Sequence, residues 1–186
     1  MKQNYLREIV FSAIAIALAT VVSVVLKLPS LPFGGSVTLF SMLIMCLPGH
    51  WFGFRTGLIA ALAYGTLQLL FDPYIIHPMQ LLLDYPLAYG ALGLAGLFHK
   101  SKNGLITGYL AGVAGRFVMH QISGFIFFTE YVPDLKGNLA ALWGSTLYNM
   151  SYIVPELVIT CILLALPPVA ALMKRLKALA AVSGTN

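Results

Sequence analysis

The feature that most constrains this chain is a succession of apolar stretches separated by short polar connections. A helix needs roughly 20 residues to cross a bilayer, at about 1.5 Å rise per residue. Only 9% of the residues are charged, whereas soluble domains have roughly 25%. The sequence therefore predicts an all-α integral membrane protein, a compact bundle forming one domain over residues 1–186. Six transmembrane helices are expected at Ile9–Leu26, Val37–Phe54, Gly57–Phe71, Met79–Phe98, Gly104–Phe128 and Leu147–Met173.

The basic residues of the connections predict the orientation of this bundle. Cytoplasmic connections of membrane proteins carry an excess of lysine and arginine. With both the N- and C-termini cytoplasmic, only Lys27 and Lys136 lie outside. The positive charge therefore indicates topology and the lipid bilayer, not a nucleic-acid partner. The cytoplasmic set is Lys2, Arg7, Arg55, Lys100, Lys102, Lys174, Arg175 and Lys177.

Four ionisable residues are expected at depth in the membrane, where each costs about 2.5–3.5 kcal/mol on insertion scales and needs a partner or a role. Arg116 and Glu156 are both expected near the midplane, which favours a structural ion pair. Asp84 lies only about 8 Å from the outer surface, by helix rise. His120 is four residues from Arg116 and shares its helix face. It is either a satisfied core histidine or part of a site with Asp84.

Aromatic residues gather in the outer half of the expected bundle. They form either the aromatic belt that membrane proteins have at the interface or the walls of a pocket open to the outside. A carboxylate with aromatic faces suits a flat cation. Asn149 could add an amide to such a pocket or cap the last helix. The candidate aromatics include Tyr74, Tyr85, Phe128, Trp143 and Tyr148.

The first expected helix contains "AIAIALA", in which small residues alternate. On a helix, residues four apart form stripes that let another helix approach closely. One interpretation is a docking face for a partner protein. The other is close packing within this bundle. The residues concerned are Ala13, Ala15, Ala17 and Ala19.

Several functional classes lack their motifs in this sequence. GxxxxGK[ST] is absent, so the chain cannot hydrolyse ATP in the manner of a P-loop protein. HExxH and GxSxG are absent as well, which excludes the familiar hydrolase motifs. Cys46 and Cys161 match no metal or redox spacing. We therefore expect no enzyme and no metal site.

Three stretches carry a family resemblance: "DPYIIHPMQLLLDYPLAYGALGLAG", "HQISGFIFFTEY" and "LYNMSYIVPE". With six expected helices and no ATPase motif, they resemble the thiamine-specific S component of an energy-coupling factor (ECF) transporter. The resemblance implies that the chain binds thiamine as its ligand, without a cofactor, in the bacterial plasma membrane. It also implies an ECF module as partner, consisting of a transmembrane coupling protein and two ATPase subunits.

The same resemblance implies roles for individual residues. Asp84 would contact the aminopyrimidine of thiamine, and Phe128 would stack on the ligand. Tyr74, Tyr85, His120 and Asn149 would complete the site. Some family members have glutamate instead of Asp84 and a tryptophan where this chain has "PFGGSV", in which Phe33 could substitute. A tyrosine of some members falls on Gly144 here, so Trp143 or Tyr148 would take its role.

Three other hypotheses remain open at this point. The ligand could be another vitamin or a precursor such as the hydroxymethyl-pyrimidine. The chain could be an intramembrane enzyme that uses Asp84 and His120 as an acid–base pair. It could also be a proton-coupled carrier that works without an ATPase.

Overall fold

The computed structural model describes residues 2–29, 31–71, 73–131 and 137–181. In these ranges the chain is helical apart from its connections, with one isolated antiparallel bridge between Lys27 and Thr38. The prediction of an all-α fold is confirmed. Lys136, which the orientation argument counts as external, lies outside the described residues.

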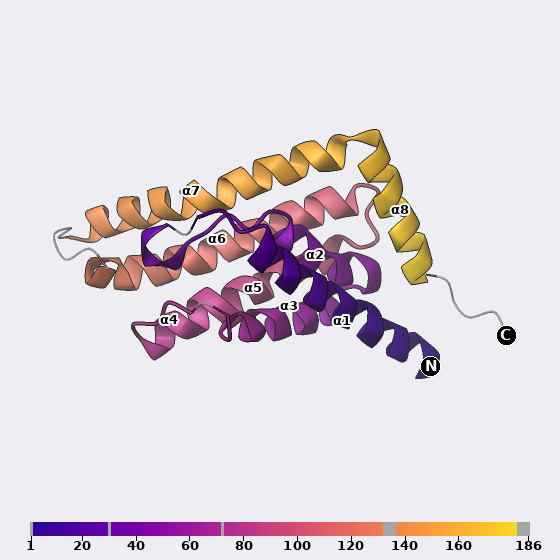
Figure 1. Ribbon diagram of the computed structural model, residues 1–186, viewed down its shortest axis with the longest axis horizontal. Coiled ribbons are helices and arrows are strands. Elements are labelled where there is room, and N and C mark those ends of the chain that lie inside the picture. Colours follow the sequence, from indigo (N-terminus) through magenta and orange to yellow (C-terminus); the bar gives the residue numbers. More distant parts are fainter. Residues whose placement is uncertain (1, 30, 72, 132–136, 182–186) are drawn as a thin grey trace.

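Among the described residues, four helical segments are long and apolar enough to cross a membrane. They are α1 (Lys2–Val25), a composite helix over Pro78–Phe98, α6 (Gly104–Tyr131) and α7 (Asn138–Ala165). Figure 1 shows α6 and α7 running side by side along one flank, with α1 crossing the other. The start of α1 and the end of the last helix lie at the same end of the bundle (Figure 1).

Helices α2 (Ser41–Phe52) and α3 (Phe54–Gln68) are shorter, with 12 and 15 residues. Gly53 alone joins them, and its φ of 96° is one that a residue with a side chain rarely adopts. Helix α2 starts later than the Val37 expected from the sequence because the preceding residues fold back along the bundle (Figure 1). The third expected helix, Gly57–Phe71, corresponds to α3. It lies nearer the N-terminus than expected, because the turn at Gly53 lets the helix begin at Phe54.

The last expected helix, Leu147–Met173, differs from the structure at both ends. Helix α7 begins already at Asn138, and it ends at Ala165. Leu166 is extended because the following proline disfavours helical backbone in the residue before it. A separate helix, α8 (Pro167–Ala181), then turns across the end of the bundle (Figure 1). Lys177 holds it there by donating a hydrogen bond to the His99 carbonyl, at 2.8 Å.

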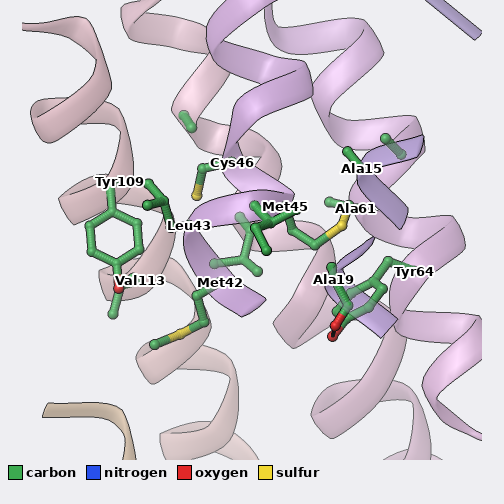
Figure 2. Packing of buried hydrophobic residues seen from close by; sticks show 14 of the residues in the cluster. Ala15, Ala19, Met42, Leu43, Met45, Cys46, Ala61, Tyr64, Tyr109 and Val113 are labelled. Atoms are coloured by element: carbon green, nitrogen blue, oxygen red, sulfur yellow. Dashed lines mark hydrogen bonds between the residues drawn. The ribbon is translucent and has the colours of Figure 1, made fainter. Parts of the chain in front are cut away.

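The core lies where α2 meets α1, α3 and α6, and Figure 2 shows its side chains. Ala15 and Ala19 are buried in it, and the Tyr64 hydroxyl lies 3.5 Å from the Ala19 carbonyl. Ala13 and Ala17 are exposed on the opposite side of α1. Residues two apart on a helix point about 200° apart, at 3.6 residues per turn. A single docking face of all four alanines is therefore wrong: Ala15 and Ala19 pack inside the bundle.

Glycines bring α2 and α3 against η3 (Ala91–Phe98), the inner end of the composite helix. A Cβ on Gly96 would lie 2.5 Å from the backbone nitrogen of Phe54, and one on Gly57 would lie 2.5 Å from the Cα of Gly49. Real Cβ atoms do not approach backbone this closely. The tight contact fixes the C-terminal part of the composite helix, and both this part and the preceding turn that carries Asp84 lie beside α6.

Candidate ligand-binding site

A cavity of about 340 Å³ lies between the composite helix, α6, α7 and the segment that precedes α2. Seven of the eight residues predicted for the ligand site line it. The exception is Trp143, which is 59% exposed and does not line the cavity. The lining residues from the prediction are Tyr74, Asp84, Tyr85, His120, Phe128, Tyr148 and Asn149.

Asp84 lies in an irregular part of the composite helix. After α4 (Pro78–Leu82), the backbone widens into one π-helical turn, η2 (Leu83–Leu87), before α5 (Ala88–Gly90). Pro86 contributes to this turn because it has no N–H to donate to the regular helical ladder. Such π-turns are frequent at functional sites, since they change the direction of a side chain without ending the helix.

Both carboxylate oxygens of Asp84 have protein partners. Oδ1 lies 2.9 Å from His120 Nδ1, and Oδ2 accepts a hydrogen bond from Gln80 Nε2 at 2.7 Å. Gln80 is buried and also donates to the carbonyl of Tyr74, at 3.0 Å. Sequence reasoning missed Gln80, although its spacing of four residues from Asp84 on one helix was a usable signal.

Arg116 extends this network on α6. Its Nε donates to His120 Nε2 at 3.3 Å, and its guanidinium lies over the ring of Tyr89, 4.2 Å from the centroid. Because His120 Nε2 accepts a hydrogen bond here, the ring proton belongs on Nδ1, which donates it to Asp84. His120 is thus a neutral bridge between a cation and a carboxylate.

Glu156 does not form the expected ion pair with Arg116. Its Oε1 accepts from the backbone N–H of Met42 at 3.1 Å, and its Oε2 accepts from the Thr38 hydroxyl at 3.3 Å. Met42 is in the first turn of α2, where N–H groups have no partner within the helix and the dipole favours an anion. The two buried charges are therefore satisfied separately, Glu156 by α2 and Arg116 by His120 and Tyr89.

Tyr148 fastens the segment before α2 over the cavity. Its hydroxyl donates to the Pro32 carbonyl and accepts from the N–H of Gly35 at 2.7 Å. Phe33 packs edge-on against Tyr148, with ring centroids 5.8 Å apart, and also lines the cavity. Phe33 adopts a positive φ of 66°, a strained conformation that occurs often at ligand sites.

Asn149 lies at the α7 side of the cavity, well inside the helix, so it is not a helix cap. Its Oδ1 accepts from the Tyr152 hydroxyl at 2.7 Å, and its Nδ2 donates to Ser145 Oγ at 3.1 Å. Opposite it, Phe128 occupies the space that the missing side chain of Gly144 leaves, since a Cβ there would lie 2.4 Å from the Phe128 ring. Gly144 therefore fixes the position of an aromatic wall.

Comparison with known proteins identifies the family. Residues 9–176 match the family described as thiamine transporter protein (Thia_YuaJ). The chain belongs to this family. The thiamine transporter ThiT of Bacillus subtilis is 34% identical over 172 residues, covering 82% of this chain and 88% of that protein. ThiT of Lacticaseibacillus paracasei is 27% identical over 141 residues, which is 66% of each chain.

The fold of this thiamine transporter family member is shared with a solved structure. ThiT from Listeria monocytogenes superposes with a TM-score of 0.68 at 23% identity, over 88% of this chain and 96% of that one. The resemblance drawn from the sequence is thus confirmed. The protein is a membrane transport protein and not an enzyme.

Proposed function

We propose that the protein is a thiamine-binding S component, which takes up thiamine with high affinity through the bacterial plasma membrane. The observation that carries the proposal is the partly buried Asp84 carboxylate, which His120 and Gln80 hold against an aromatic-walled cavity. Family membership supports thiamine as the solute. Among the described residues that line the cavity, Asp84 is the only carboxylate.

The chemistry of thiamine matches these groups. Asp84 accepts a hydrogen bond from the exocyclic amine of the aminopyrimidine, because an ionised carboxylate can only accept. Tyr85, Phe128 and Tyr148 supply aromatic faces for the two rings, and such faces attract the thiazolium cation. Tyr74, His120 and Asn149 add polar groups to the lining. A preorganised and largely desolvated site of this kind can bind tightly with few contacts.

The membrane arrangement belongs to the same proposal. A single domain of six transmembrane helices, with α2 and α3 as the two short ones, would place both termini in the cytoplasm. In support, α1 starts and α8 ends at the same end of the bundle (Figure 1). Lys177 of α8 meets His99 at that end, next to the basic connection that contains Lys100 and Lys102.

Energy for release would come from an ECF module, a transmembrane coupling protein with two ATPase subunits. The exposed stripe of Ala13 and Ala17 supports a docking site on α1, because small residues four apart admit another helix closely. Ile14 and Leu18 flank this stripe and are exposed too. The docking face is thus narrower than the sequence indicated.

Calorimetric titration of the purified protein with thiamine tests the ligand. We expect saturable binding at or below micromolar thiamine, and competition with hydroxymethyl-pyrimidine shows whether the precursor alone is sufficient. No heat at micromolar thiamine would refute the proposal. Uptake by proteoliposomes tests the mechanism: transport should require the ATPase module, and uptake by the isolated protein would instead support a self-sufficient carrier.

A further inference from the structure

Ser123 has a hydroxyl that the protein itself does not use. It lies on α6 among the cavity-lining residues, one turn beyond His120 and two residues before Phe125. Its side chain is 1% exposed, and its Oγ has no hydrogen-bond partner among the residues that the structure describes. A buried hydroxyl without a partner costs about 1–3 kcal/mol. A residue with this cost at a cavity wall points to a partner that enters the cavity.

Several other hydroxyls in the helices behave differently. Serine and threonine within a helix commonly bond back to the carbonyl four residues earlier. Thr20, Thr107 and Thr146 do so, at distances between 2.7 and 3.1 Å. Ser123 makes no such bond, so its hydroxyl has no partner among the described residues.

Several polar neighbours of Ser123 already donate hydrogen bonds within the protein. Arg116 donates its Nε to His120, Gln80 donates to Asp84 and Tyr74, and the amide of Asn149 donates to Ser145. Helices α6 and α7 cross tightly beside it, because a Cβ on Gly124 would lie 1.8 Å from Ser145 Oγ. Ser123 therefore lies next to a tight α6–α7 contact, one turn along α6 from His120.

We propose that Ser123 Oγ donates a hydrogen bond to a ring nitrogen of the bound pyrimidine and so makes the site specific for that ring. The inference rests on the proposed function. An aminopyrimidine presents both a donor, its exocyclic amine, and acceptors, its ring nitrogens. Asp84 can satisfy only the donor. A hydroxyl without another partner satisfies an acceptor, and a ligand without that nitrogen leaves the buried hydroxyl unpaired.

The test combines one variant with three ligands. Dissociation constants for thiamine, and for its two pyridyl analogues with carbon in place of N1′ or N3′, are measured by calorimetry on the wild type and on Ser123→Ala. We expect Ser123→Ala to weaken thiamine binding about tenfold. One of the two analogues should bind equally well to both proteins, because it lacks the acceptor. Unchanged thiamine affinity, or an equal loss for all three ligands, would overturn the proposal.

Two controls separate this inference from its alternatives. Ser12→Ala removes a buried, unpartnered hydroxyl on α1 that does not line the cavity, and should leave all three affinities unchanged. Ser123→Ala should melt no lower than the wild type without ligand, because alanine favours helix and no internal hydrogen bond is lost. A lower melting temperature would indicate a structural role and count against the proposal. A wild type that does not bind thiamine would instead refute the proposed function.

Discussion

His120 and Asp84 are 36 residues apart in the sequence, and His120 Nδ1 meets Asp84 Oδ1 at 2.9 Å. The contact joins the middle of α6 to the π-helical turn of the composite helix. Because Gln80 holds the other oxygen, the carboxylate is oriented before any ligand arrives. Preorganisation of this kind raises ligand affinity, because fewer side chains lose conformational freedom when the ligand binds.

Asp84→Asn should weaken thiamine binding by about tenfold or more, because the amide replaces an ionised acceptor at a charge-assisted contact worth about 1.5–3 kcal/mol. Calorimetry measures the effect. Glu8→Gln is the matched control, since Glu8 accepts from Thr56 and does not line the cavity. Equal affinities for Asp84→Asn and the wild type would place the ligand elsewhere.

Glu156→Leu should destabilise the protein by about 2–3 kcal/mol, since the Met42 N–H and the Thr38 hydroxyl lose a charged acceptor. Thermal unfolding without ligand measures this. A double-mutant cycle with Arg116→Met tests whether Glu156 interacts directly with Arg116 or only with its partners at the start of α2. Separate partners predict nearly additive effects, whereas a direct ion pair predicts a large coupling energy.

Substitution by a larger side chain should have different effects in the two alanine stripes of α1. Ala15→Leu inserts a large side chain into the packed core shown in Figure 2 and should lower stability by about 1–3 kcal/mol. Ala17→Leu, on the exposed side, should keep stability and thiamine affinity but reduce uptake with the ATPase module. Normal uptake by Ala17→Leu would show that α1 does not dock through this stripe.

Gly96→Ala should be far more destabilising than Gly90→Ala. At Gly96 the new Cβ would meet the backbone of Gly53 and Phe54 at 2.5 Å, so the helices must separate. At Gly90 it would meet only the side chain of Leu62, which can move. The melting temperatures of the two variants test this prediction. Similar temperatures would mean that the α3–η3 contact is not tight.

Trp143→Phe should leave thiamine affinity unchanged, because Trp143 is exposed outside the cavity. Tyr148→Phe should weaken it severalfold, because the segment over the cavity loses its hydrogen bonds at Pro32 and Gly35. The comparison tests which aromatic residue near Gly144 contributes to the site. A loss confined to Trp143→Phe would reverse the assignment.

The apolar runs of the sequence predicted the helical class, and the family resemblance implied most of the residues that gather at the cavity. The sequence did not predict which charges meet. Whether Glu156 faces Arg116 or the start of α2 depends on where the preceding segment enters the bundle. The sequence reading also treated the two alanine stripes as neighbours, although their spacing places them on opposite sides of α1.

Other differences come from local backbone that pattern reasoning did not treat. The widened turn at Asp84 contains Pro86, and Gln80 in the preceding turn donates to the carboxylate. The helix ends before Leu166 because Pro167 follows it. The sequence contains this proline, but it lies within a continuous apolar run that was interpreted as one helix. Ser123 could not be singled out, because only the structure shows which hydroxyls lack a partner.

Helix α7 holds the segment before α2 at two places, through Tyr148 at Pro32 and Gly35 and through Glu156 at Thr38. Because Glu156 also binds Met42, the same carboxylate that anchors the cover satisfies the first turn of α2. For the proposed thiamine site, we therefore expect release on this side to require that these hydrogen bonds break together. The residence time of the solute then depends on how fast this segment separates from α7, and not only on the contacts between the solute and the cavity.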